Sequence, residues 1–370
     1  MKSNKQQFFA LGLLSLLALA SCKKDDPVAP KTGEIASTRG IYMLSEGSWG
    51  KNNSALSYYD IATNTVEADI YEKINKTKLG ETANDLKAYG SKMYVVVSGT
   101  AGGGNSFVDI MSISTGKSLK RISFNDGTNS FIPRYVAFHQ NKAYVSRYDG
   151  VITRIDTATM AIDGDLQLMN GAVKAGALEG VAVANGKLYV TNSSNDYANP
   201  NSLKTKVTVI DLATFKKTKD IEVGLNPGRI AVAGNGDLYA VTSNVWGNDN
   251  KPTLVRINST TDAVSQTEEY GLSVINIVND QAWTAGTTGI RAINLATGKL
   301  GNALITDATS IAMPYGLTVN PFDKTVVVAD AESYSATTGK AYVFSADGKK
   351  KYSFTTNQLP QHAVFTYNYK

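Results

Sequence analysis

Acidic, arginine, amide and aromatic residues recur at corresponding places in this chain, and their types suit a binding surface better than a reaction centre. Tyr and Trp side chains supply rigid contact area, while Arg, Asn and carboxylate groups supply polar contacts. Together they suit a large, amphipathic and partly planar ligand. The candidate ligand-binding residues are Glu46, Trp49, Asp85, Arg134, Tyr148, Glu179, Asn192, Arg229, Trp246, Tyr315, Tyr334 and His362.

Catalytic groups are scarce in comparison. The chain has 2 His and 1 Cys, and neither His139 nor His362 has a Ser or Cys partner at the spacing of a nucleophilic motif. No zinc-ligand spacing occurs, and the glycine run 102–104 lacks the lysine of a phosphate-binding loop. We therefore predict a protein that is not an enzyme and carries no cofactor or metal.

Short strands must position the candidate residues. Residues 178–191 hold two alternating apolar runs on either side of Asn185 and Gly186, a pair typical of a β-hairpin turn. The second strand of this hairpin occurs in seven copies. The shared positions are Tyr42, Tyr94, Tyr144, Tyr189, Tyr239, Trp283 and, without an aromatic ring, Val326.

A second hairpin follows in each copy, with Asp or Asn opening its turn, as at Asp60, Asp156, Asp211 and Asn294. These side chains favour turns because they bond their own backbone two residues on. Four short strands in each repeat of roughly 40–50 residues are typical of a β-propeller blade. We predict an all-β fold, a seven-bladed β-propeller of four-stranded antiparallel blades, over residues 38–370.

The first and last strands are predicted to close the ring. Residues 40–44 already match the second strand of a blade, and residues 359–366 match the missing first strand, as found also at 132–138 and 313–319. The C-terminal strand should therefore join blade 1. Such closure removes an open sheet edge.

The N-terminus is predicted to be a targeting and anchoring segment. Residues 1–21 combine Lys2 and Lys5 with an apolar run too short to span a bilayer as a mature helix, as in a signal peptide. The sequence before Cys22 resembles the lipobox of lipoproteins, so we expect a lipid on Cys22 and a flexible linker over 22–37. Four charged residues at 23–26 resemble an export signal to the outer face of the outer membrane, although a solvated tether explains them nearly as well.

The long connections are predicted to lie on one face of the ring. Turns after the first and third strands of each blade are short, whereas connections after the second and fourth strands carry most of the added length. Insertions on one face of a repeat fold usually mark its binding face. The same face should carry the residues that enter the innermost strands, which are Asp85, Arg134, Glu179, Arg229, Tyr315 and His362.

The repeats resemble the YVTN-type, YncE-like propeller repeat. More narrowly, residues 43–50, followed by Asn52, Asn53 and 56–60, resemble the opening blade of Bacteroidetes surface lipoproteins that include the BtuG-like cobalamin-capture proteins. The resemblance implies capture of a corrinoid on one face and its transfer to a TonB-dependent transporter in the outer membrane.

Two alternatives stay open at this point. One is a protein-interaction platform in a surface nutrient-uptake complex. The other is a metal-dependent lactonase-like propeller, whose divalent ion would be held by Glu46, Asp85, Glu179, Asn192 and Asn244. Nucleic acid is not an expected partner, because the net charge of +5 falls to +3 once Lys2 and Lys5 leave with the leader. We expect the isolated protein to be a monomer.

Overall fold

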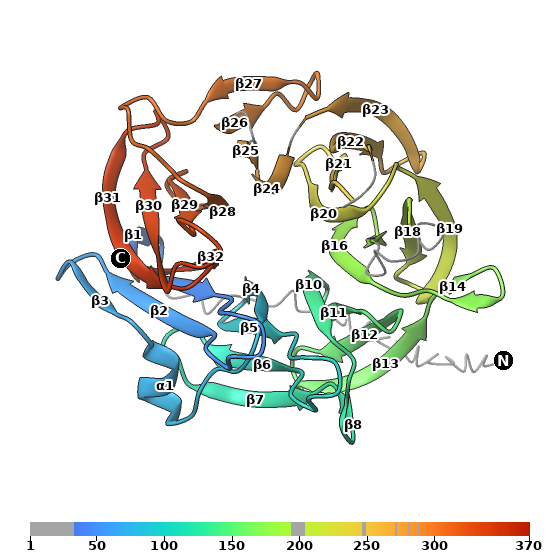
Figure 1. Ribbon diagram of the computed structural model, residues 1–370, viewed down its shortest axis with the longest axis horizontal. Helices are drawn as coiled ribbons and strands as arrows, with labels where there is room; N and C mark the ends of the chain where they lie inside the picture. Colours follow the sequence, from blue (N-terminus) through green and yellow to red (C-terminus); the bar gives the residue numbers. More distant parts are fainter. Residues whose placement is uncertain (1–32, 194–203, 246–248, 271, 280, 287–288) are drawn as a thin grey trace, which may run out of the picture.

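A computed structural model describes residues 33–193, 204–245, 249–270, 272–279, 281–286 and 289–370. Cys22, Trp246, the predicted leader and most of the predicted linker lie outside these ranges. Seven four-stranded antiparallel sheets form a closed ring (Figure 1). The predicted all-β, seven-bladed propeller is therefore confirmed.

Each blade is listed from its innermost to its outermost strand. Blade 1 contains β32 (Pro360–Tyr369), β1 (Ile35–Ser45), β2 (Ala55–Asp60) and β3 (Thr65–Glu67). Blade 2 contains β4 (Ala83–Tyr89), β5 (Lys92–Val97), β6 (Phe107–Ser112) and β7 (Ser118–Ser123). Blade 3 contains β10 (Pro133–His139), β11 (Lys142–Arg147), β12 (Val151–Asp156) and β13 (Ala161–Gln167). Blade 4 contains β16 (Leu178–Ala184), β17 (Lys187–Asn192), β18 (Lys206–Asp211) and β19 (Lys216–Glu222).

The remaining three blades follow the same order. Blade 5 contains β20 (Pro227–Val232), β21 (Leu238–Thr242), β22 (Thr253–Asn258) and β23 (Ala263–Glu269). Blade 6 contains β24 (Leu272–Val278), β25 (Gln281–Gly286), β26 (Gly289–Ile293) and β27 (Leu300–Ala303). Blade 7 contains β28 (Pro314–Val319), β29 (Val326–Asp330), β30 (Thr338–Phe344) and β31 (Lys350–Asn357).

The C-terminal strand closes the ring as predicted. β32 pairs with β1 from Ile35 opposite Tyr369 to Ser45 opposite Pro360. β1 begins at Ile35, three residues before the predicted start of the propeller. The two ends of the described chain therefore meet, and the backbone N–H of Lys370 donates to the carbonyl of Glu34 at 2.9 Å.

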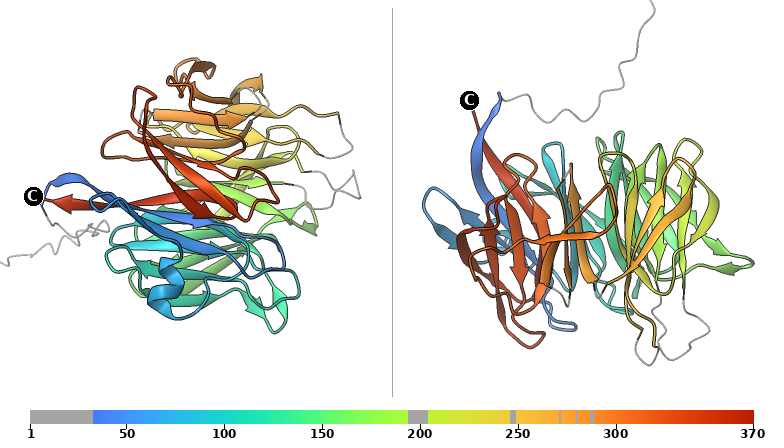
Figure 2. Two further views of the ribbon diagram at one scale, coloured as in Figure 1. Left: turned by 60° about the vertical axis from the view of Figure 1, so that its left-hand side comes forward. Right: turned by 90° about the horizontal axis from the view of Figure 1, so that it is seen from above.

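The two faces of the ring follow from strand direction. Turns after first and third strands lie on one face, here called the tight-turn face, and both ends of the described chain emerge there. Connections after second and fourth strands lie on the opposite, long-loop face. In the right-hand view of Figure 2 the start of β1 and the C-terminus project together from one side of the ring.

Three insertions that follow fourth strands were not predicted. They are α1 (Ile70–Asn75), the hairpin of β8 (Asn125–Asp126) with β9 (Asn129–Ser130), and the hairpin of β14 (Met169–Asn170) with β15 (Val173–Lys174). α1 is capped by the Asp69 side chain, which accepts from the N–H of Glu72 at 3.0 Å. Within the described ranges no helix is long and apolar enough to cross a membrane.

The core consists of apolar clusters between neighbouring blades. Each shared aromatic residue of a second strand is buried in the seam to the next blade: Tyr42, Tyr94, Tyr144, Tyr189, Tyr239 and Trp283. The prediction of Val326 as the seventh member was wrong by one residue. Tyr239 lies opposite Ala231, the fifth residue of β20, and Val327 lies opposite Thr318, the fifth residue of β28. The seventh position is therefore Val327.

Candidate functional site

The candidate residues of the innermost strands all lie within the first three residues of those strands. In every blade the pairing between first and second strand is interrupted by a bulge at this point. A bulge changes the direction of neighbouring side chains and is common beside functional sites. The second residue of an innermost strand contacts the second residue of a neighbouring or nearby innermost strand, and the third residues contact one another in the same way.

The second residues form the outer ring of side chains, whose members are Asn84, Arg134, Glu179, Tyr315 and Gln361. Arg134 Nε donates to Glu179 Oε2 at 3.0 Å, and the Asn84 amide donates to the carbonyl of Arg134 at 2.6 Å. The Arg134 and Glu179 side chains are only 18% and 11% exposed. A charged pair so poorly solvated needs well-oriented partners.

Tyr148 completes the pair between Arg134 and Glu179. Its hydroxyl donates to Glu179 Oε1, and the Arg134 guanidinium lies over its ring at 4.9 Å from the centroid. Burial alone would lower the pKa of Arg134, but the charges of Glu179, Tyr148 and Tyr135, together with the hydrogen bond to Glu179, outweigh burial and raise that pKa. Burial, followed by the charge of Glu179, raises the pKa of Tyr148. The group is thus a rigid, internally neutral unit.

Glu46 comes from the β1–β2 connection and joins blade 7 to blade 1. The Tyr315 hydroxyl donates to Glu46 Oε2 at 2.6 Å, and the Gln361 amide donates to the same oxygen at 3.3 Å. Burial raises the pKa of Glu46, whereas the Tyr315 hydrogen bond and the charges of Arg134 and Arg229 oppose the rise. The carboxylate is therefore held in place facing two arginines that it does not bond.

The third residues form the inner ring, whose members are Asp85, Tyr135, Arg229 and His362. Asp85 is fully buried, and its Oδ2 accepts from the N–H of Val136 at 3.0 Å. His362 Nε2 lies 3.8 Å from Asp85 Oδ1 and has no hydrogen-bond partner. Burial lowers the pKa of His362 to about 4, although Asp85 opposes the shift. His362 is therefore neutral at pH 7, and its buried Nε2 is shielded from any ligand.

Arg229 differs from the other charged groups of the two rings. Its guanidinium lies 5.8 Å from the centroid of the Tyr135 ring, and among the described residues no carboxylate lies within ion-pair distance. Burial raises the pKa values of Glu46 and Tyr135, and the charge of Arg229 opposes part of that rise. Among the charged side chains of the two rings, Arg229 is therefore best placed to donate to an anionic or carbonyl group of a ligand.

Exposed aromatic side chains flank the rings on the long-loop face. Trp49 is 66% exposed and Tyr334 is 72% exposed. Gln358 joins their loops, because its side chain accepts from Ser48 Oγ at 2.6 Å and donates to the carbonyl of Tyr334 at 3.3 Å. Tyr334 also packs edge-on against Tyr315, with 6.2 Å between centroids. The exposed side chains of Trp49 and Tyr334 therefore lie near Glu46, on loops that Gln358 holds together.

The remaining predicted residues are not brought into this group by any described contact. Asn192 ends β17, where its side chain is buried and its Oδ1 has no partner. Asn244 is exposed and meets Asn226 only through its backbone carbonyl. Trp246 lies outside the described residues. No group of three or more His, Cys, Asp or Glu side chains within the described ranges is arranged to hold a metal ion.

Sequence reasoning missed five residues that build the site: Asn84, Ser98, Tyr135, Gln358 and Gln361. Arg134 Nη1 donates to Ser98 Oγ at 3.3 Å, and Gln361 also donates to the carbonyl of Ala83 at 2.9 Å. Tyr135 and Gln361 directly adjoin the predicted Arg134 and His362. In a regular strand two consecutive side chains point to opposite faces of the sheet, so the sequence pattern assigns only one of them to the site. The bulge at the start of every innermost strand brings two consecutive side chains to the site.

Comparisons with known proteins agree with the fold. The chain is similar to hydrazine synthase of Kuenenia stuttgartiensis, with 14% identity over 70% of this chain and 74% of that chain and a TM-score of 0.51. At this identity the likeness concerns the fold alone. A comparison with curated proteins gave no match. A family profile described as a domain of unknown function, DUF5074, matches residues 39–366, so the chain belongs to the DUF5074 family of β-propellers.

Proposed function

We propose that this propeller is a binding protein without chemistry of its own, and that it captures a large, partly planar ligand on its long-loop face. The observation that supports this proposal is the pair of exposed aromatic side chains, Trp49 and Tyr334. Gln358 joins their loops beside the hydrogen-bonded Glu46 and Tyr315. Exposed aromatic rings on rigid supports gain contact area at little entropic cost. The polar side chains of the outer and inner rings then orient a ligand at the axis of the propeller.

The specific ligand we propose is a corrinoid. Its flat macrocycle suits stacking on Trp49 or Tyr334. Its amide side chains can donate to Glu46, and its phosphodiester can accept from Arg229. The resemblance of residues 43–50 to cobalamin-capture proteins supports the same choice. In this proposal the protein is lipid-anchored through Cys22 on the cell surface and delivers the corrinoid to a TonB-dependent outer-membrane transporter.

The position of the chain ends supports this arrangement. The first described residues meet the C-terminus on the tight-turn face, where Lys370 bonds Glu34. A tether from Cys22 therefore joins the ring on the side opposite Trp49 and Tyr334. The long-loop face is then free to meet a ligand or a transporter. Replacement of Cys22 by Ala should release the protein from membranes without changing ligand affinity.

Calorimetry and visible absorbance with cyanocobalamin test the proposal. We expect saturable binding at micromolar concentration, with affinity lowered roughly tenfold or more in W49A and Y334A, the usual effect of removing a buried aromatic contact. Tyr369, 45% exposed on the tight-turn face, supplies a matched control, and Y369A should bind normally. Absence of both heat and spectral change would remove the corrinoid claim. Binding of a purified transporter without any corrinoid would favour the protein-interaction platform.

A further inference from the structure

Neighbouring blades are joined by a repeated hydrogen bond from the shared tyrosine. Tyr42, Tyr189 and Tyr239 each reach across a seam and donate to a backbone carbonyl just after the next blade's third strand, in the residue that follows Ser112, Asn258 or Asn294. The acceptors are Ile113 at 3.1 Å, Ser259 at 3.1 Å and Leu295 at 3.0 Å, respectively. In these three seams a phenol ring with its hydroxyl on a carbonyl fills the space between blades, whereas the buried Tyr94 hydroxyl and Trp283 Nε1 have no hydrogen-bond partner.

The seam between blades 7 and 1 lacks a tyrosine at this position. Val327 takes the place of the tyrosine, and Ile61, which follows Asp60, takes the place of the acceptor residue. Val327 is 1% exposed and packs in the cluster that contains Ile41 and Phe365. Valine has no ring that could reach toward Ile61, which packs at the edge of the same cluster.

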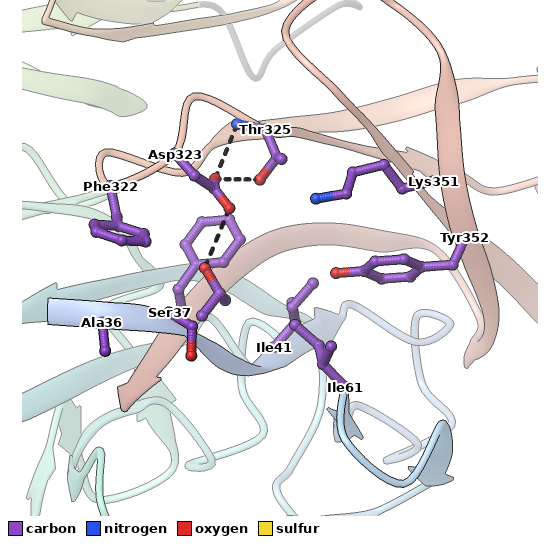
Figure 3. Close-up of a pocket in the computed structure, with 11 residues that line it drawn as sticks. Ala36, Ser37, Ile41, Ile61, Phe322, Asp323, Thr325, Lys351 and Tyr352 are labelled. Carbon is purple, nitrogen blue, oxygen red and sulfur yellow. Dashed lines mark hydrogen bonds between the residues drawn. The ribbon is translucent and has the colours of Figure 1, made fainter. Parts of the chain in front are cut away.

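A pocket of about 280 Å³ lies in this seam, lined by Ile41, Ile61, Thr325, Tyr352 and Phe365. Ile41 and Phe365 are buried and make its inner wall apolar. In Figure 3 Lys351 and Tyr352 reach in from β31, and Asp323 from the β28–β29 turn faces them. Ala36, Ser37, Asp323 and Lys351 are exposed, so the pocket opens to the tight-turn face.

The polar groups at the opening have capacity to spare. Asp323 Oδ1 accepts from the Thr325 hydroxyl at 2.6 Å, but its Oδ2 has only a 3.4 Å contact with Thr38. Among the described residues no carboxylate lies within ion-pair distance of the Lys351 ammonium. Burial, together with the charges of Tyr59 and Asp323, raises the pKa of Tyr352 to about 12, so its hydroxyl stays a neutral donor.

We propose that this seam pocket binds a small phenol, whose ring takes the place that Tyr42, Tyr189 and Tyr239 occupy in their seams and whose hydroxyl donates to the Ile61 carbonyl. An apolar protein cavity of about 150 Å³ suffices for benzene, so 280 Å³ accommodates a substituted phenol. A polar substituent on the ring would face Asp323 and Lys351 at the opening. This site lies on the opposite face from the proposed corrinoid site and does not depend on it.

The test uses 4-methylphenol as the probe and the methyl NMR signals of Ile41 and Ile61 as the readout. We expect saturable shifts of both signals and contacts between the probe's ring protons and both methyl groups at millimolar concentration. Toluene, which lacks the hydroxyl, should bind roughly fivefold more weakly, the effect of one lost hydrogen bond. W49A, on the other face, should leave probe binding unchanged.

Two variants fill the pocket from different sides. V327Y restores the tyrosine of the other seams, and T325F fills the space from the wall, so each should weaken probe binding roughly tenfold or more. The second variant serves if the first does not fold. The proposal is overturned if neither isoleucine signal responds to the probe, or if the folded pocket-filling variants bind it as the wild type does.

Discussion

The two faces of the ring differ in how their hydrogen bonds are made. On the tight-turn face, Asp60, Asp156, Asp211, Asn258 and Asn294 repeat one local turn, in which Oδ1 accepts from the N–H three residues on at 2.8–3.1 Å. On the long-loop face the residues of the candidate site bond partners that are distant in sequence, and Tyr315 and Glu46 are 269 residues apart. The tight-turn face repeats this local turn in five blades, whereas the bond between Tyr315 and Glu46 joins the last blade to the first.

Loss of the C-terminal strand should have the largest effect, because it separates local from assembled structure. Deletion of residues 360–370 removes β32, exposes the edge of β1 and takes Gln361 and His362 out of the long-loop face. We expect no cooperative unfolding transition and a tendency to aggregate, measured by circular dichroism and gel filtration. Deletion of residues 1–32 is the control and should leave the transition intact. A soluble truncated protein with a normal transition would contradict ring closure by β32.

An ion pair on each face allows the comparison to be sharpened. Glu179 bonds Arg134 on the long-loop face, and Asp237 accepts from Arg256 Nε at 2.9 Å on the tight-turn face. Removal of one member of a poorly solvated pair leaves the other uncompensated, so E179A and D237A should each lower the unfolding free energy by about 4 kcal/mol. Urea titration measures this change. Only E179A should also weaken cyanocobalamin binding, and equal losses of binding in both variants would contradict the assignment of the binding face.

His362 should give the long-loop face its own pH dependence. Burial lowers its pKa from 6.5 to about 4, so between these values the unfolded chain binds a proton that the folded chain does not. Stability should therefore be constant above about pH 6.5 and fall by about 3 kcal/mol as the pH drops to 4. Urea titrations at several pH values, compared with H362Q, measure this contribution. Identical pH profiles for the two proteins would show that His362 is not buried as described.

A single turn of the tight-turn face should matter least. Asn258 Oδ1 accepts from the N–H groups of Thr260 and Thr261 at 3.0 and 2.9 Å. N258A should cost about 1 kcal/mol of unfolding free energy, and N258D should restore it, because Asp156 and Asp211 make the same turn. Thermal unfolding of the two variants checks this. A loss in N258D equal to that in N258A would contradict the equivalence of the turns.

The contrast between the faces also explains what could be predicted from sequence. Local turn chemistry and the alternation of apolar residues indicated the strands, the seven blades and the closing strand. The assignment of Val326 in place of Val327 shows the limit of this approach, because the turn at 320–325 is longer than the Asn185–Gly186 turn and only the register resolves it. α1 and the hairpins β8–β9 and β14–β15 lack the repeat signal altogether.

The site was predicted in composition but not in arrangement. The sequence placed Asp85, Arg134, Glu179, Arg229, Tyr315 and His362 at the starts of innermost strands, where they are found. It did not indicate that Arg134 pairs with Glu179 while Arg229 has no carboxylate beside it, nor that Gln358 joins the Trp49 and Tyr334 loops. These contacts depend on blade-to-blade geometry and on bulges, which local patterns do not encode.

Hydrogen exchange with and without cyanocobalamin tests the central claim most directly, because it reports both faces in one experiment. We expect slower exchange in the presence of ligand at residues 46–53 and 331–337, with no change at the turns 61–64 and 259–262. Protection of the tight-turn face instead, or equal protection of both faces, would contradict a ligand-binding long-loop face.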